Sequence, residues 1–400
     1  MAMNGYRINV TVIPKNAPTT SIIRFIILYV ILSVYYTLVM KIALVHDYLN
    51  QYGGAERVLE SFAGIFPDAP IFTLLHDKNR TMNRFDGRVK GTSFLDSEFV
   101  SKNHRPFIPL MPFAANRMNL GSEFDVVLSS SAGYGKGIRH SDKSAHIAYC
   151  HTPLRYAWES QRYFNLGPAM ELATAPAFWY LRNWDFKAGQ RPKHIFANSN
   201  YIADKIRQYY RRDAEVLYPP VDLKVFYRDK RIKKQGYFLA VGRILHYKKF
   251  DLIIQAFNRL NLPLIVIGDG PELENIKKMV RSSRIHFLPF MQEEELRTFY
   301  NGAEAVIFPQ EEDFGLVAAE AQACGTPVIA YSQGGAREII QDGVTGVLFR
   351  NQTVDDLVLA VKKFLLSSFD ENFIRESAKR FSRTKFENRI KKIVQGAVLV

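Results

Sequence analysis

Two glutamates, Glu312 and Glu320, lie where residue types and spacing point most clearly to chemistry. They flank the start of a helix that the pattern predicts from about 316 to 324, directly after an apolar run typical of a buried strand. Gly315 stands where that helix begins, so backbone N–H groups there could approach a phosphate closely. A buried glutamate on this alanine-rich helix needs a partner, and sugar or ribose hydroxyls would serve. The alternative is a surface glutamate on an amphipathic helix.

Two cations, Arg243 and Lys248, follow another predicted strand on a strand-to-helix loop. At five positions apart on one loop, both could reach a single anion. The arginine offers a planar fork to phosphate oxygens, and the lysine offers a compact charge. A solvated basic loop is equally compatible with this spacing.

The first half of the chain offers two further candidate groups. Gly53 and Gly54 form a flexible turn that opens a helix, which again suits a phosphate. His151 follows an apolar run at 146–149 and lies near a proline and two aromatic residues, so it could make a polar contact in a cleft. A lone histidine is more often structural, and that alternative stays open.

The elements that must position these groups form a repeating pattern. Continuous apolar runs alternate with helical patterns in two successive series, which indicates two buried parallel sheets. A Pro-Pro connection at 217–222 and a charged stretch at 228–234 separate the two series. The sequence therefore predicts two doubly wound α/β domains facing each other across a cleft, with ligands beyond the carboxyl ends of the strands. The predicted strands are Ile42–Val45 (followed by a polar loop at 46–54), Val126–Ser129, His146–Tyr149, His194–Ala197, Tyr237–Val241, Leu264–Ile267, Ile285–Leu288, Ala305–Phe308, Val328–Ala330 and Val347–Phe349.

The composition excludes several classes of protein. Lys and Arg total 53 against 39 Asp and Glu, and the net charge of +14 favours an anionic partner. Nucleic-acid binding is not expected, because the basic residues are not interleaved with aromatic platforms and form no known nucleic-acid-binding string. Two cysteines cannot build a disulfide framework or a zinc cluster, and they favour a reducing cytosol. A mean hydropathy of −0.12 excludes a multi-span membrane protein.

Four motifs in this order resemble glycosyltransferase family 4. They are Gly53-Gly54-Ala55-Glu56, the Gly242-Arg243…Lys248 loop, Glu312-x7-Glu320 with Phe-Gly between, and Gly334-Gly335…Glu338. The resemblance covers about residues 40–395. The sub-pattern His-Thr-Pro-x-Arg-Tyr-x-Trp at 151–158, with Glu-Asp-Phe-Gly at 312–315 and Glu-Ala-Gln-Ala-Cys-Gly-Thr-Pro at 320–327, is similar to the mannosyltransferases of surface-polysaccharide assembly. The resemblance implies a retaining enzyme of GT-B fold. Such an enzyme moves a hexosyl group, mannosyl being favoured, from a nucleoside-diphosphate sugar to a saccharide or lipid-linked saccharide.

The resemblance also implies roles for individual residues. Arg243 and Lys248 would hold the donor diphosphate and stabilise its developing charge. Glu320 would accept the ribose hydroxyls, Glu312 would touch the sugar hydroxyls, and His151 would contact the donor sugar near the reaction centre. Further implied contacts with the donor come from Gly53, Gly54, Met291, Phe314, Gly315 and Leu316.

The implied domains are an acceptor-side domain at 40–216 and a nucleotide-sugar-binding domain at 217–379, with a helix at about 380–396 packing back on the first. No metal and no cofactor is expected, because cations and a helix N-terminus would stabilise the leaving diphosphate. GDP-mannose is the favoured donor. The expected location is the cytoplasm, with peripheral contact to the inner face of the plasma membrane. The segment Phe99–Met118 interleaves basic and apolar residues and suits an anionic leaflet, although a core helix under the cleft is the alternative.

Two rival functions remain open. A nucleotide-sugar epimerase or dehydrogenase would need a third glycine near Gly270 and a Tyr-x-x-x-Lys pair at a strand end, and the sequence offers neither. A non-enzymatic basic scaffold at the membrane would tolerate alanine at Glu320 and Arg243, whereas an enzyme would not. For the enzyme, a same-face route assisted by the diphosphate is preferred, since no carboxylate stands out for a double displacement.

Residues 1–39 differ from the rest of the chain. The apolar run from Phe25 to Met40 has 16 residues, shorter than the roughly 20 needed to cross a bilayer. A small-residue cleavage site of the A-x-A kind is missing. Met40 stands directly before the first predicted strand. We therefore expect translation to start at Met40, with 1–39 a non-native or poorly ordered extension.

Overall fold

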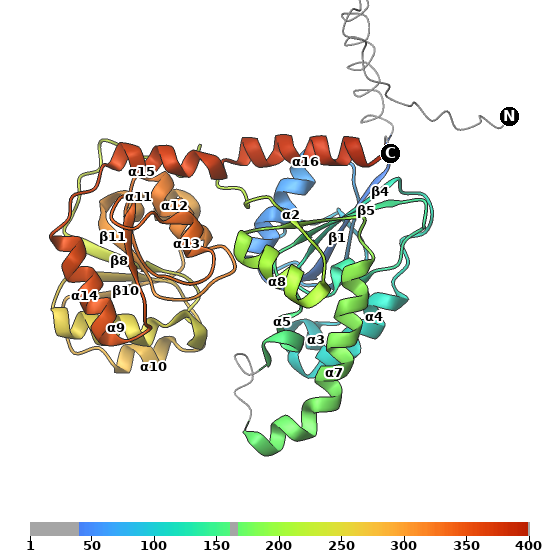
Figure 1. Cartoon of the computed structure of the whole chain (residues 1–400), viewed down its shortest axis with the longest axis horizontal. Helices are drawn as coiled ribbons and strands as arrows, with labels where there is room; N and C mark the ends of the chain where they lie inside the picture. Colours follow the sequence, from blue (N-terminus) through green and yellow to red (C-terminus); the bar gives the residue numbers. More distant parts are fainter. Residues whose placement is uncertain (1–39, 161–166, 399–400) are drawn as a thin grey trace, which may run out of the picture.

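The computed structural model describes residues 40–160 and 167–398, which form two α/β halves lying side by side (Figure 1). The first half is built on a seven-stranded sheet in the order β3-β2-β1-β4-β5-β6-β7, and the second on a six-stranded sheet in the order β10-β9-β8-β11-β12-β13. All strand pairs in both sheets are parallel. This confirms the predicted fold class. The expectations for residues 1–39 fall outside the described residues.

The first sheet reverses its strand order beside β1, where β2 lies on one side and β4 on the other. Polar groups carried beyond the ends of these strands therefore meet at one edge, as at other topological switch points. The elements of this half are β1 (Ile42–Leu49), α2 (Gly54–Ile65), β2 (Ile71–His76), β3 (Val89–Gly91), α3 (Glu98–Lys102), η1 (Arg105–Leu110), α4 (Met111–Arg117), β4 (Val126–Ser131), η2 (Gly135–Gly137), β5 (Ala145–Cys150), α5 (Arg155–Trp158), α7 (Pro168–Gln190), β6 (His194–Ala197), α8 (Asn200–Tyr210) and β7 (Glu215–Val216).

The polar loop predicted from residue 46 is wrong in its first part, because β1 continues through residue 49. Two polar residues of this part, His46 and Asp47, find hydrogen-bond partners inside the protein. The Asp47 carboxylate accepts hydrogen bonds from the Ser131 hydroxyl at 3.0 Å and from the backbone amides of Ala132, at 2.5 Å, and Gly135. Strands β2, β3 and β7 were not predicted, and the last two have only three and two residues.

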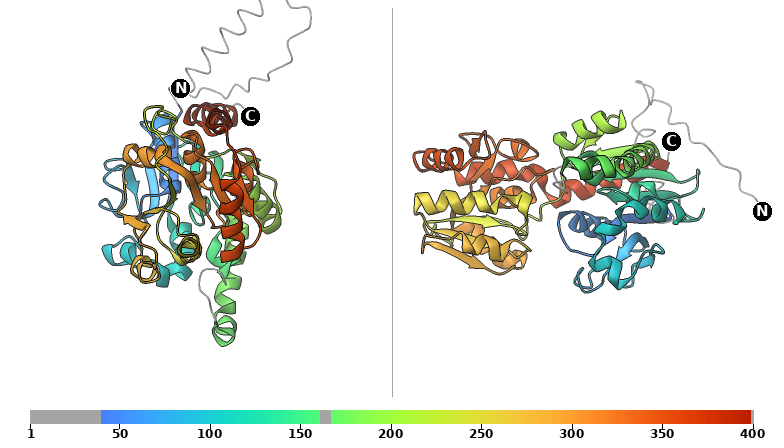
Figure 2. Two further views of the ribbon diagram at one scale, coloured as in Figure 1. Left: turned by 90° about the vertical axis from the view of Figure 1, so that its left-hand side faces the viewer. Right: turned by 90° about the horizontal axis from the view of Figure 1, so that it is seen from below.

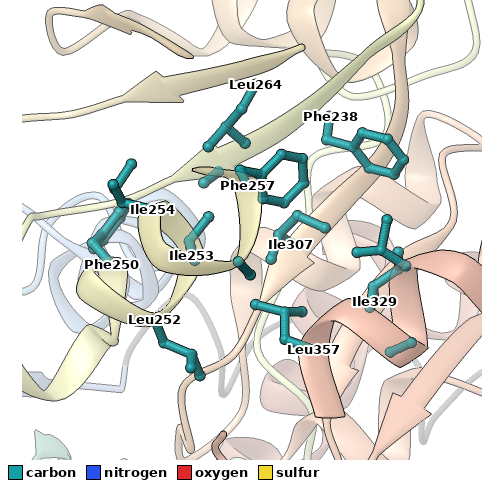
Figure 3. Packing of buried hydrophobic residues seen from close by; sticks show 14 of the residues in the cluster. Phe238, Phe250, Leu252, Ile253, Ile254, Phe257, Leu264, Ile307, Ile329 and Leu357 are labelled. Carbon is teal, nitrogen blue, oxygen red and sulfur yellow. The ribbon is translucent and has the colours of Figure 1, made fainter. Parts of the chain in front are cut away.

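The second half is held by a core in which α9 packs on the sheet, as Figure 3 shows for Phe257, Phe238 and Ile307. The elements of this half are β8 (Tyr237–Val241), η3 (His246–Lys248), α9 (Phe250–Leu260), β9 (Leu264–Ile267), α10 (Leu273–Lys278), β10 (Ile285–Leu288), α11 (Glu293–Gly302), β11 (Ala303–Phe308), α12 (Leu316–Ala323), β12 (Val328–Tyr331), α13 (Ala336–Ile339), β13 (Gly346–Phe349), α14 (Val354–Leu365), α15 (Glu371–Ala378) and η4 (Lys379–Phe381).

The last helix, α16 (Arg383–Val398), returns to the first half and lies against α2 (Figures 1 and 2). The Phe386 ring stacks on the Phe62 ring with centroids 5.8 Å apart, and it meets Tyr149 edge-on. Phe386, Ile390 and Val394 are buried in the same apolar cluster as Phe62. The first half therefore completes its core with residues from the far end of the chain.

Candidate functional site

The two halves touch where their strand ends meet. A side-chain carbon at Gly54, at the start of α2, would lie 3.0 Å from Leu316 Cδ1, at the start of α12. The Ser199 hydroxyl of the first half donates to the Asp313 carbonyl of the second at 2.5 Å. Two of the predicted site residues, Arg243 and Glu320, contact residues of the first half at this junction.

Glu312 and Lys248 form an ion pair, which brings together two residues that the sequence placed on different loops. The Gln310 amide also donates to Glu312 Oε1, at 3.1 Å. Burial by itself would raise the pKa of Glu312, but the Lys248 ammonium and the Gln310 amide outweigh it and hold that pKa below its usual value. Glu312 is therefore a fixed carboxylate, able to accept hydrogen bonds from hydroxyl groups.

The backbone beneath Glu312 explains the Gly334-Gly335 motif. The Gly335 amide donates to the Glu312 carbonyl at 2.8 Å. Gly334 has φ +69°, and a side-chain carbon there would lie 2.3 Å from the same carbonyl. Only glycine lets the two loops approach this closely.

Glu320 is buried, with 2% of its surface exposed, and its partners are protein groups. Arg57 Nη1 on α2 donates to Oε1 at 2.5 Å, and the Tyr300 hydroxyl donates to Oε2 at 3.0 Å. Arg57 also contacts Glu293 Oε1 at 3.1 Å. Burial opposes the charge on Arg57, yet the two carboxylates raise its pKa above the usual value. The position predicted to meet ribose hydroxyls is thus occupied here by an arginine from the other half.

Arg243 is exposed and donates to Gln51 Oε1 of the first half at 2.8 Å. Its loop is supported by the turn at 268–270, because Ile244 N donates to the Asp269 carbonyl at 2.8 Å. Gly268 has φ +148°, and a side-chain carbon there would lie 2.0 Å from the Gly242 carbonyl oxygen. The Gly268-Asp269-Gly270 turn therefore packs against the Arg243 loop.

His151 lies in the first half, 7% exposed, at the end of β5. Its Nε2 is 2.8 Å from the Ser130 hydroxyl, and its carbonyl accepts from the Asn198 amide at 3.0 Å. Burial is the main cause that lowers the pKa of His151 to about 3, and the nearby charge of Arg155 adds to it. The ring is therefore neutral at ordinary pH and offers one donor and one acceptor nitrogen.

The remaining predicted residues have different surroundings. The Gly53 amide donates to Glu56 Oε2 at 2.8 Å, so that N–H is engaged. Gly315 has φ +105° and caps α12, whose eight residues begin at Leu316. The Phe314 side chain is buried in the core of the second half, and Met291 is half-buried beside the same core.

Sequence reasoning missed an ion pair and several hydrogen bonds that join the halves. Arg155 pairs with Asp313, and Tyr201 donates to Glu311. Glu338, part of a predicted motif, accepts from the Tyr201 amide at 2.9 Å. These partners are more than a hundred residues apart, and a charged residue alone carries no signal of which distant residue it meets.

Two family models match the chain in tandem. Residues 52–225 match the model described as Glycosyltransferase Family 4, and residues 225–385 match the model described as Glycosyl transferases group 1. D-inositol 3-phosphate glycosyltransferase from Mycobacterium tuberculosis is 35% identical over 171 residues, which is 38% of this chain. The match covers 36% of that relative's length, so the chain spans about a third of it.

Solved structures show the same fold. Anabaena HepE in complex with UDP is 17% identical, with a TM-score of 0.67 over 89% of this chain and 100% of that one. Sucrose-phosphate synthase from Thermosynechococcus elongatus is 15% identical, with a TM-score of 0.63 over 88% of this chain and 98% of that one. At these identities the likeness concerns the fold, in which two Rossmann-like domains face each other.

Proposed function

The chain carries a Glycosyltransferase Family 4 domain followed by a group 1 glycosyl transferase domain, and on this premise we propose that it transfers a hexosyl group from a nucleoside-diphosphate sugar. One observation carries the proposal. Two carboxylates, Glu312 and Glu320, and two cations, Lys248 and Arg243, lie near the junction of the halves, and His151 lies at the end of β5 in the first half. Carboxylates suit hydroxyl groups and cations suit a diphosphate, so the set matches both parts of such a donor.

The residues divide the work of the reaction. Departure of the diphosphate builds negative charge, which Lys248, Arg243 and the N-terminus of α12 would stabilise. Glu312 would accept hydrogen bonds from sugar hydroxyls. Glu320 would lose its contact with Arg57 and accept hydrogen bonds from the ribose hydroxyls instead. We favour retention of configuration by a same-face route, in which the leaving diphosphate assists the acceptor hydroxyl.

The donor and acceptor are proposed more finely from sequence motifs. The strings at 151–158, 312–315 and 320–327 together favour a mannosyl donor, GDP-mannose first, and a saccharide or lipid-linked acceptor in surface-polysaccharide assembly. The solved complex of HepE with UDP-glucose supports a nucleotide-sugar donor as a class. Across residues 40–160 and 167–398, no group of three or more His, Cys, Asp or Glu side chains is arranged to hold a metal ion. That the reaction needs no metal stays a prediction.

We further propose cytoplasmic location with peripheral contact to an anionic membrane, through the segment Phe99–Met118. One side of this segment is core, since Met111 and Ala115 are buried, while Phe99 and Phe113 are exposed. Among the helices of the described residues, none combines the length and apolar character needed to cross a bilayer. Basic residues near an anionic leaflet contribute about 1 kcal/mol each.

The membrane proposal is tested by sedimentation with liposomes, with and without anionic lipid. We expect binding to anionic vesicles that Phe99→Ser with Phe113→Ser weakens. Leu366→Ser is the matched control, because Leu366 is 92% exposed in the other half. Absence of binding to both kinds of vesicle would refute the proposal.

The transfer proposal is tested with a panel of nucleotide sugars and bare nucleotides, scored by protection against thermal unfolding and then by hexose transfer. A ligand at one hundred times its Kd stabilises the folded protein by about 2.7 kcal/mol. We expect GDP-mannose to protect most, with unchanged transfer in the presence of a chelator, and Arg243→Ala to lose the protection. If every nucleotide sugar leaves the melting temperature unchanged, the proposed function is wrong.

A further inference from the structure

A row of three buried polar side chains runs behind the site, from β1 through β4 to His151. His46 and Ser130 are register partners on adjacent strands. His46 Nδ1 lies 3.1 Å from Ser130 Oγ, and Ser130 Oγ lies 2.8 Å from His151 Nε2. Ser130 is 0% exposed and His46 2% exposed. Water therefore has little access to the row, and its hydrogen bonds must be satisfied among its own members.

The far end of the row is a carboxylate. His46 Nε2 lies 3.5 Å from Glu56 Oε1, and the other oxygen of Glu56 accepts the Gly53 amide. An ionised carboxylate only accepts hydrogen bonds, so its position favours a proton on His46 Nε2. On a neutral His46 ring, Nδ1 is then the acceptor nitrogen, and the Ser130 hydroxyl donates to it.

The direction of the Ser130–His46 hydrogen bond determines which nitrogen of His151 carries the proton. Once the Ser130 proton points at His46, the Ser130 oxygen is left to accept, and the only group in the row that can donate to it is His151 Nε2–H. The neutral ring of His151 then has an unprotonated Nδ1. Among residues 40–160 and 167–398, this nitrogen has no hydrogen-bond partner.

We propose that Glu56, acting through His46 and Ser130, sets the tautomer of His151 so that Nδ1 is a hydrogen-bond acceptor. The inference rests on the proposed function, in which His151 contacts the donor sugar. Nδ1 then accepts a hydrogen bond from a sugar hydroxyl and donates none to the leaving oxygen. Glu56, His46 and Ser130 are positioning residues, and the same Glu56 carboxylate also holds the turn at Gly53 on the phosphate side.

The tautomer is measured directly by nitrogen NMR of the full chain with ¹⁵N-labelled histidine, without donor, using His151→Gln to assign its signals. We expect His151 to show a protonated Nε2 and an unprotonated Nδ1. Ser130→Ala cuts the row, so the His151 signals should shift toward the other tautomer or a mixture, while Ser130→Thr restores them. Ser129→Ala is the matched control, since that hydroxyl meets His146 at 2.9 Å instead of His151.

Glu56→Gln separates the carboxylate from the rest of the row. The charge that favours a proton on His46 Nε2 is lost, so we expect the His151 signals to move in the same direction as in Ser130→Ala. Protonated Nδ1 in the wild type, or unchanged His151 signals in both variants, overturns the proposal. This measurement needs no transfer reaction, so it stands even if the proposed function fails.

The activity of the same variants gives a second readout. One hydrogen bond to a substrate hydroxyl corresponds to about a 3- to 10-fold change. We expect kcat/KM to fall by that factor in Ser130→Ala and to recover in Ser130→Thr, with Ser129→Ala unchanged. Equal activity of Ser130→Ala and Ser129→Ala would contradict a positioning role even where the tautomer shifts.

Discussion

Lys136→Met is expected to destabilise the first domain strongly, because it leaves a buried carboxylate without its cation. Lys136 is 1% exposed, and its Nζ lies 2.7 Å from Asp185 Oδ1. Asp185 Oδ2 accepts from Leu154 N at 3.2 Å, from Trp158 Nε1 at 2.7 Å and from the Tyr210 hydroxyl at 2.8 Å. The pair therefore anchors the loop that follows His151.

The magnitude follows from the burial of both partners. Removing one member of a buried ion pair costs about 3–5 kcal/mol, since the remaining charge stays in a poorly polar surrounding. Methionine fills most of the lysine volume, so a cavity adds little. For a domain of this size each kcal/mol lowers the melting temperature by about 2–4 °C, which gives a drop of about 6–20 °C.

A double variant tests whether the unpaired charge of Asp185 causes the loss of stability. Lys136→Met combined with Asp185→Asn removes the unpaired charge and keeps an oxygen for the three donors, so it should recover more than half of the lost free energy of unfolding. The chain's three tryptophans, at 158, 179 and 184, all lie in the first domain. Urea unfolding followed by tryptophan fluorescence therefore reports on this domain alone. A loss below about 1 kcal/mol, or no recovery in the double variant, would refute the reasoning.

Three further predictions concern the site. Arg243→Ala and Lys248→Ala should each lower kcat at least a hundredfold with the fold intact; normal turnover in steady-state assays would exclude them from the diphosphate site. Glu320→Gln should weaken binding of the bare nucleotide in calorimetry, whereas Glu312→Gln should leave that binding unchanged and lower the rate of transfer. Equal losses of nucleotide binding in the two variants would contradict this division of roles. The pKa of His151 is about 3 in the folded protein and near 6.5 in the unfolded chain. This difference stabilises the folded state fully at pH values above 6.5, and the stabilisation is lost as the pH falls from 6.5 toward 3. The stability of the wild type should therefore decline relative to His151→Gln on acidification, and kcat/KM should show no limb from His151 between pH 5 and 8; a limb near 6.5 that vanishes in the variant would contradict this.

Apolar runs were sufficient to predict most strands, because a buried parallel strand has no polar face to interrupt it. They fail where polar residues continue a strand, as at His46 and Asp47, whose partners come from the neighbouring strand. They also fail for β7, which is too short to show a pattern.

The candidate site shows a similar limit. Its members could be proposed from residue type and from their position after strands. Their partners could not, because Arg57 and Glu320 are 263 residues apart and meet only when both domains are folded. Sequence reasoning assigned ligand hydroxyls to Glu320, and the structure adds an arginine that such a ligand must displace.

The return of α16 to the first domain affects the order in which a newly made chain can fold. Phe386, Ile390 and Val394 complete the core around α2, yet they leave the ribosome after the whole second domain. At about 5–20 residues per second, the roughly 170 residues between β7 and α16 take about 10–30 s to synthesise. During that interval the Phe62 side of α2 lacks its cover, so the nascent first domain presents an apolar surface until translation is nearly finished.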